Sequence, residues 1–148
     1  MKKKFKSYAV NTFLLAIATI SIWQLSSCKG DEAPSAQDLV KSKLTSATWK
    51  IQSVKVDGVD QTSVYTGFTL TVTDGNFTTV NGGPAWPASG TWTFTSNDGS
   101  RVKRDDGTEI DVEITETTLK LTFEWATTTI GSGRSLSVKG KNVFTLTQ

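Results

Sequence analysis

The residue types that most often carry out chemistry in proteins are scarce in this chain. Its 148 residues include no histidine and one cysteine, Cys28. The sequence therefore excludes a Ser-His-Asp triad, a Cys-His pair and an imidazole zinc site. A single cysteine also excludes an internal disulfide, a CxxC redox pair and a thiolate metal cluster. Carboxylates and arginines remain as the groups that could act on a substrate or bind a metal.

Four carboxylates lie close together in the segment RDDGTEID at residues 104–111, namely Asp105, Asp106, Glu109 and Asp111. Oxygen-rich loops bind calcium, but the twelve-residue spacing and closing glutamate of an EF-hand are absent. Paired carboxylates could hydrolyse glycosides, yet nothing in the sequence marks two of them as buried together. We expect Asp106-Gly107 to form a turn and Glu109 and Asp111 to lie on the wet face of a strand. We therefore expect no metal site, no cofactor and no catalysis.

The N-terminal 28 residues read MKKKFKSYAVNTFLLAIATISIWQLSSC, and they have the layout of an export signal. A basic segment precedes an apolar stretch from about Ala9 to Leu25, which contains several polar residues. The stretch is shorter and more polar than the roughly 20 apolar residues of a spanning helix. We therefore predict a signal peptide over residues 1–27.

The end of this signal, Leu25-Ser26-Ser27-Cys28, resembles the lipobox of bacterial lipoproteins. The resemblance implies cleavage before Cys28, a diacylglyceryl group on its sulfur, and an acyl group such as palmitate on its new amino group. Acyl chains contribute about 0.8 kcal/mol per buried CH₂, and two or more give stable anchoring. The alternative is an ordinary secretory signal that happens to contain a cysteine.

Cleavage would change the charge of the chain. The full sequence carries 16 Lys+Arg and 14 Asp+Glu, a net charge of +2. Residues 1–27 contain four lysines and no acidic residue, so the remaining 121 residues have a net charge of −2. A mildly acidic domain lacks the basic surface that nucleic acid requires.

Residues 28–36 are polar and short, and we interpret them as the lipid anchor and a tether. Asp31 and Glu32 resemble the surface-export signal of Bacteroidota lipoproteins. Lys29 departs from the inner-membrane retention pattern of enteric bacteria, which has Asp at that place. The resemblance favours the outer membrane and leaves open which leaflet, including the cell surface.

The remaining chain, residues 37–148, reads as one all-β domain with a short N-terminal helix. Leu39, Val40 and Leu44 have helical spacing over residues 35–46, with Ser35 as the N-cap. From Thr48 onward apolar residues alternate with polar ones, as in a sheet with one buried face. The runs predict eight strands: 48–56, 67–73, 76–80, 90–95, 100–104, 109–115, 118–125 and 142–147.

Four Asp-Gly pairs, at 57–58, 74–75, 98–99 and 106–107, separate these runs. Asp-Gly is typical of tight hairpins, in which both turn residues take positive φ. Consecutive hairpins predict an antiparallel up-and-down meander, which closes into an eight-stranded barrel because closure removes sticky edges. An open β-sandwich is the alternative fold.

The order of elements resembles the lipocalin-like domain of small Bacteroidota lipoproteins over roughly residues 44–148. Trp49, Val54 and Val56 running into Asp57-Gly58, and the later Trp92 in SGTWTF, carry the resemblance. Lipocalins place Gly two residues before the first tryptophan, where this chain has Ala47. The resemblance implies a barrel that holds small apolar molecules and implies no reaction.

The barrel interior and two long connections are the candidate sites. Alternation predicts an inward set of Trp49, Ile51, Phe68, Leu70, Val72, Phe77, Trp92, Phe94, Val102, Ile110, Val112, Ile114, Leu119, Leu121, Phe123, Phe144 and Leu146. An eight-stranded barrel is either filled by such side chains or holds one small ligand. In NGGPAWPAS, at 81–89, Trp86 is a lid, a contact for a partner or sugar, or a residue folded back onto the barrel. In the connection at 126–137, Arg134 either meets a ligand carboxylate or is solvated.

We therefore predict a lipid-anchored, non-catalytic binder of a small apolar or amphipathic ligand. The predicted ligand-binding residues are Trp49, Phe68, Trp86, Trp92, Phe123 and Arg134. The alternative is an accessory subunit that docks its outer face or Trp86 onto an outer-membrane complex. A cavity of roughly 300 Å³ or more would support a ligand. A filled interior with an exposed apolar patch around Trp86 would support a protein partner.

Overall fold

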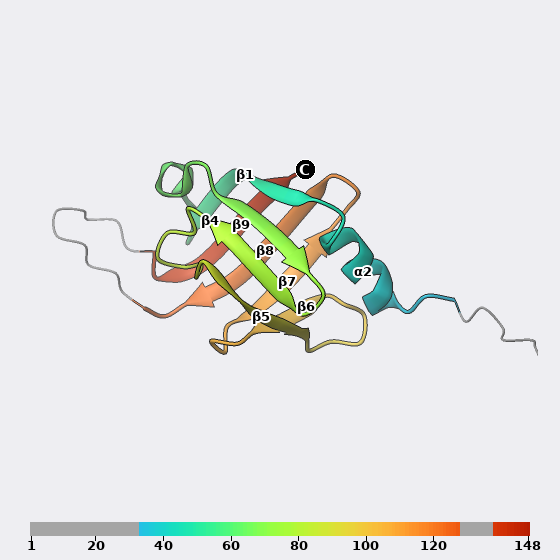
Figure 1. The fold of residues 1–148 in the computed structure, drawn as a ribbon. Helices are drawn as coiled ribbons and strands as arrows, with labels where there is room; N and C mark the ends of the chain where they lie inside the picture. Colours follow the sequence, from blue (N-terminus) through green and yellow to red (C-terminus); the bar gives the residue numbers. More distant parts are fainter. Residues whose placement is uncertain (1–32, 128–137) are drawn as a thin grey trace, which may run out of the picture. The chain divides into compact units, whose positions relative to one another are not determined.

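Alternating apolar and polar side chains build a sheet along almost all of the described chain. The computed structural model describes residues 33–127 and 138–148 (Figure 1). Their elements are α2 (Ala36–Leu44), β1 (Thr48–Val56), β2 (Val59–Asp60), the 3-10 helix η1 (Thr62–Tyr65), β3 (Thr69–Thr73), β4 (Asn76–Val80), β5 (Ser89–Phe94), β6 (Arg101–Arg104), β7 (Glu109–Ile114), β8 (Thr118–Trp125) and β9 (Gly140–Thr147).

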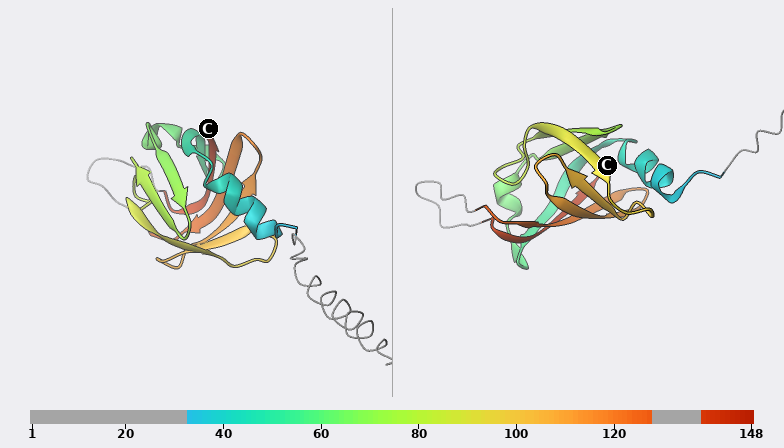
Figure 2. Two further views of the ribbon diagram at one scale, coloured as in Figure 1. Left: turned by 45° about the vertical axis from the view of Figure 1, so that its right-hand side comes forward. Right: turned by 90° about the horizontal axis from the view of Figure 1, so that it is seen from below.

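All strand pairs are antiparallel, in the order β2-β1-β3-β4-β5-β6-β7-β8-β9, and β1 also pairs with β9. This last pairing closes β1 and β3 to β9 into an eight-stranded barrel, which Figure 2 shows from two further sides. The two-residue β2 is a short extension paired to β1. The predicted all-β up-and-down barrel is confirmed, and the sandwich alternative is wrong.

The four Asp-Gly pairs all lie in turns, but only one has the predicted backbone. Asp57 and Gly58 take φ of 48° and 83°, whereas in the other three pairs only the glycine is positive. Asp98 Oδ1 accepts hydrogen bonds from the amide of Ser100, and Asp106 Oδ1 accepts one from the amide of Thr108. A carboxylate that bonds the backbone two residues later closes a turn at negative φ. The expectation of two positive φ angles is therefore wrong for three of the pairs.

Strand β1 changes which of its residues face inwards. Trp49 and Ile51 point to the interior, and after a register shift between Ile51 and Ser53 the buried residues are Val54 and Val56. A β-bulge adds one residue to one strand, so the inward parity reverses beyond it. This is why strict alternation over residues 48–56 identifies only the first half of the inward set.

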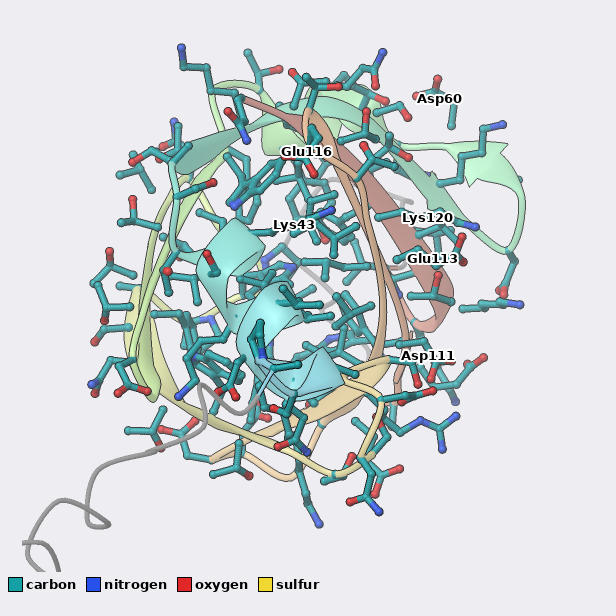
Figure 3. The ribbon with its side chains drawn as sticks, turned by 90° about the vertical axis from the view of Figure 1, so that its right-hand side faces the viewer. Lys43, Asp60, Asp111, Glu113, Glu116 and Lys120 are labelled. Atoms are coloured by element: carbon teal, nitrogen blue, oxygen red, sulfur yellow. The ribbon has the colours of Figure 1, made fainter. Side chains whose placement is uncertain are left out.

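Helix α2 covers one end of the barrel, as Figure 3 shows from that side. Ser35 is its N-cap and forms a capping box with Asp38, as its residue type predicts. Leu44, its last residue, is buried in the core. The indole of Trp49 donates to the Leu44 carbonyl oxygen at 3.0 Å, so the helix and the first strand are joined inside the barrel.

The opposite end, called here the Trp86 end, is formed by η1, the β4–β5 loop at residues 81–88, the β6–β7 turn and the facing ends of β8 and β9. Residues 34–148 make a compact unit with a closed sheet and a buried core of their own. These are the properties of a domain that folds independently. No helix among the described residues has the length and hydropathy needed to cross a membrane.

Most of the predicted inward set is buried in the core. Ile51, Phe94 and Ile114 are the exceptions, and they are half-buried against it. The core also contains residues that alternation did not identify, among them Tyr65 from η1 and Trp86 from the β4–β5 loop. These two fill the Trp86 end from the inside.

Candidate functional site

A small apolar cavity lies inside the barrel between α2 and the β4–β5 loop. It has a volume of about 40 Å³ and extends from Leu44 at one end to Trp86 and Arg104 at the other. Ligand pockets are usually larger than roughly 300 Å³. As the described residues enclose it, therefore, this cavity has no room for a lipid chain.

Trp86 closes the barrel from the inside. Its side chain is only 5% exposed, so the structure folds it back onto the barrel and leaves no exposed apolar patch at this residue. Four aromatic rings surround the indole at centroid distances of 5.7 to 6.0 Å, those of Phe68, Phe77, Phe123 and Phe144. Edge-to-face and tilted ring pairs at these distances stabilise a packed cluster. Trp86 is thus an internal plug.

Two glycines allow the β4–β5 loop to turn inwards. A Cβ at Gly82 would collide with the carbonyl oxygen of Trp86, and one at Gly83 would lie 2.9 Å from the Tyr65 ring. Gly83 also takes a φ of 58°, which favours glycine. The loop is held by the Trp86 amide, which donates to Gly82 O at 3.1 Å, and by Thr79 Oγ1, which donates to the carbonyl oxygen of Pro87 at 2.7 Å.

Arg104 lies inside the Trp86 end, with only 3% of its surface exposed. Its guanidinium donates to both carboxylate oxygens of Asp106, to Ala85 O at 3.0 Å and to Thr108 Oγ1 at 3.3 Å. Its Cζ lies 4.8 Å from the centroid of the Trp86 ring, which is cation–π distance. The arginine therefore joins the plug to the β6–β7 turn.

Asp106 provides the charge that balances Arg104. Burial raises the pKa of its carboxyl, but hydrogen bonds from Arg104 and Thr108 outweigh this and hold the pKa below its usual value. At neutral pH the pair is therefore ionised and carries no net charge. The other acids of the cluster are used differently: Asp105 accepts from the Thr91 amide and Asp111 pairs with Arg101. Within the described residues, no three acidic, histidine or cysteine side chains gather as metal ligands.

Several buried polar atoms at the Trp86 end have no hydrogen-bond partner among the described residues: Tyr65 Oη, Trp86 Nε1, Trp125 Nε1 and Asn142 Oδ1. They belong to one neighbourhood. The Tyr65 ring lies 4.7 Å from Phe144, the Trp125 ring lies 5.7 Å from the Cζ of Arg104, and Asn142 pairs in register with Phe123. Burial raises the pKa of Tyr65 to about 12, so its hydroxyl keeps its proton at neutral pH.

The structure brings only part of the predicted ligand set together. Trp86 and Trp92 line the cavity, whereas Trp49, Phe68 and Phe123 are buried in the core outside its wall. Arg134 and Cys28 lie outside the described residues, as does the predicted signal peptide.

Sequence reasoning missed Tyr65, Arg104, Trp125 and Asn142 as site residues. A signal for Arg104 exists, because it shares the inward parity of Val102 on β6. Tyr65 lies in a 3-10 turn, where strand alternation does not apply. No protein-family model and no curated protein matches the chain.

Proposed function

We propose that the protein is a membrane-anchored, lipocalin-like lipoprotein that binds a small apolar or amphipathic ligand in its barrel and catalyses no reaction. The observation that carries this proposal is the apolar cavity that ends at the buried indole of Trp86. The space is too small for a lipid while Trp86 fills the end of the barrel. Outward movement of the indole would add the volume of a large side chain to the same apolar space.

The Trp86 end is the better entrance of the two. At the other end α2 is capped by Ser35, and its lysines Lys41 and Lys43 pair with Asp74 and Glu116 on two different turns. Trp86 Nε1 has no partner in the closed form. A buried donor without an acceptor costs about 1–3 kcal/mol, and water would satisfy it when the indole moves outwards. This gain offsets part of the free-energy cost of moving the Trp86 indole outwards.

Binding of an uncharged apolar fluorophore, N-phenyl-1-naphthylamine, tests the proposal on the Pro34–Gln148 unit. Trp86→Ala removes the plug, so we expect it to bind the fluorophore at least about tenfold more tightly than the unaltered protein, which corresponds to about 1.4 kcal/mol. Phe94→Ala is the matched control, because Phe94 is a half-buried aromatic residue at the α2 end. If Trp86→Ala binds no better than this control, the barrel interior is not a binding space. Trp86→Phe serves if the alanine variant does not fold.

An accessory subunit of an outer-membrane complex is the second candidate function. The nearly filled interior favours it, as does a surface hollow of about 590 Å³ beside the β4–β5 loop, lined by Pro84, Pro87 and Trp125 among others. Val59 and Val80 are exposed large apolar residues. Crosslinking in intact membranes would then recover one protein partner at a fixed ratio, and Val80→Lys would abolish the crosslink.

A further inference from the structure

Buried hydrogen-bond donors without acceptors are concentrated at the Trp86 end. They are the hydroxyl of Tyr65 and the indole nitrogens of Trp86 and Trp125. Tyr65 and Trp86 are 0% and 5% exposed, so bulk water does not satisfy them. Native proteins pair the large majority of such groups. Asn142 Oδ1, the unpartnered acceptor of the same neighbourhood, bonds none of these three donors, so they point to an acceptor atom from outside the described residues of the barrel.

The other two described indoles, those of Trp49 and Trp92, do have acceptors, so the missing acceptors are specific to the Trp86 end. Trp49 Nε1 donates to the Leu44 carbonyl oxygen, and Trp92 Nε1 donates to the carbonyl oxygens of Thr73 and Asn76, all at 3.0 to 3.1 Å. Both lie towards the α2 end of the same barrel. The indoles of Trp49 and Trp92 thus have backbone acceptors, whereas those of Trp86 and Trp125 have none among the described residues.

The charges at this end specify the kind of acceptor. Arg104 is the only charged side chain among the buried described residues, and the carboxylate of Asp106 already balances it. The guanidinium also bonds Ala85 O and Thr108 Oγ1. A ligand carboxylate would be a second acid on one arginine. Burying such an uncompensated charge costs several kcal/mol of desolvation free energy, and a neutral oxygen does not carry that charge.

Resting on the ligand-binding function proposed above, we infer that the ligand is an uncharged amphiphile whose hydroxyl or carbonyl oxygen accepts hydrogen bonds from one or two of the unpartnered donors Tyr65 Oη, Trp86 Nε1 and Trp125 Nε1. Its alkyl part lies in the apolar cavity towards Leu44. Arg104 positions the indoles, because its Cζ lies 4.8 Å from the Trp86 ring and 5.7 Å from the Trp125 ring. Fatty acids are excluded as ionised carboxylates.

Nuclear magnetic resonance of the indole N–H groups tests this inference directly. The Pro34–Gln148 unit contains four tryptophans, so ¹⁵N-labelled protein gives four indole signals that tryptophan-to-phenylalanine variants assign. With octan-1-ol we expect the signal of Trp86, of Trp125 or of both to move downfield. The signal of Trp49 stays in place as an internal control, because its indole is already bonded to the Leu44 carbonyl oxygen and Trp49 does not line the cavity.

Three probes of equal chain length separate the outcomes. Octan-1-ol is expected to bind at least about tenfold more tightly than octanoate at pH 7. Tighter binding of octanoate would overturn the uncharged-ligand inference and leave ligand binding standing. Equal affinities and equal indole shifts for octan-1-ol and n-octane would also overturn it, because the oxygen would then contribute nothing. No binding of any probe would overturn the proposed function itself.

Tyr65→Phe separates a ligand role from a structural one. The change removes a hydroxyl that has no partner and keeps the ring beside Phe144. We expect unchanged or higher thermal stability, together with about a three- to tenfold loss of octan-1-ol affinity and no loss for n-octane. Phe94→Leu, at a half-buried aromatic residue of the α2 end that does not line the cavity, is the matched control and keeps the octan-1-ol preference. Retained octan-1-ol affinity in Tyr65→Phe would remove the tyrosine from the site.

Discussion

Replacing Arg104 by methionine tests whether the buried Arg104–Asp106 pair holds the Trp86 end closed. Methionine has nearly the length of arginine and keeps an apolar contact with the Trp86 ring. It removes the donors to Asp106, to Ala85 O and to Thr108 Oγ1. Asp106 is left as a partly buried carboxylate without its countercharge. The variant therefore isolates the polar contribution of one residue.

The expected loss of stability follows from the exposure of the two side chains. Breaking a buried ion pair by removing one partner costs about 3–5 kcal/mol. The Arg104 side chain is 1% exposed, but that of Asp106 is 34% exposed, so water compensates part of the orphaned charge. We expect a loss of about 3 kcal/mol in the free energy of unfolding. Asp106→Asn added to Arg104→Met should recover about 1 kcal/mol, because it neutralises that charge.

Urea denaturation followed by tryptophan fluorescence measures these free energies. Arg101→Met is the matched control on the same strand, because Arg101 pairs with Asp111 at 2.7 Å but both side chains are about half exposed. Exposed pairs contribute about 0–1 kcal/mol. Two results would contradict a closing role for Arg104. One is a loss of unfolding free energy in Arg104→Met no larger than that in Arg101→Met. The other is a further loss when Asp106→Asn is added to Arg104→Met.

The pH dependence of the free energy of unfolding is an independent measurement on Arg104→Met. The pKa of Asp106 is lowered in the folded protein, so its ionised form stabilises the fold above the unfolded pKa of about 3.9. That contribution is lost as the pH falls below this value. In Arg104→Met the arginine hydrogen bonds that lower the pKa of Asp106 are gone. The stability difference between the two proteins should therefore narrow below about pH 4, and a difference that stays constant to pH 2 would contradict the pairing.

Other perturbations give equally definite results. Tyr65 is the only tyrosine of residues 34–148, so absorbance titration of that unit should show one group with a pKa of about 12. Because the pKa of Tyr65 is raised in the folded protein, the free energy of unfolding should fall as the pH rises from 10 towards 12. Tyr65→Phe should lack that fall. Ser35→Ala removes the capping box of α2 and should cost about 1 kcal/mol in urea denaturation, whereas an unchanged midpoint would show that the cap is dispensable. Gly140→Ala should destabilise the β9 end by about 1–3 kcal/mol, because Gly140 takes a φ of 121° and a Cβ there would collide with the Asp57 carboxylate. Cys28→Ser should release the protein from membranes on fractionation, and continued membrane association would count against lipidation.

The barrel was predictable because its sequence signals are local. In EIDVEIT and TLKLTFEW every second residue is apolar, and both segments form strands with that pattern of burial. Asp74-Gly75 lies between β3 and β4, whose residues Thr73 and Asn76 pair directly. One buried face and one short turn per hairpin are enough to specify an up-and-down order.

The plug was not predictable, because it depends on the loop between two strands. The sequence offered three roles for Trp86, and alternation has no bearing on a residue between two prolines and after two glycines. The inward turn follows from close approaches at Gly82 and Gly83 that only the folded chain defines. The bulge after Ile51 is likewise invisible in the sequence and moves Val54 and Val56 into the core.

Arg104 was predictable in part. Its position two residues after Val102 gives it the inward parity of β6, yet its charge suggests a wet face. The pair is accommodated only because Asp106 follows in the turn and returns its carboxylate to the guanidinium. The unpartnered donors could not be found from the sequence, since hydrogen-bond satisfaction depends on three-dimensional contacts between η1, β8 and the β4–β5 loop.

Native mass spectrometry of the full chain, extracted gently from membranes, tests ligand binding most directly. We expect the barrel to carry one small uncharged amphiphile at near-stoichiometric level. A barrel that emerges empty at every extraction condition, while a membrane protein co-purifies with it at a fixed ratio, would contradict ligand binding and favour the accessory-subunit function.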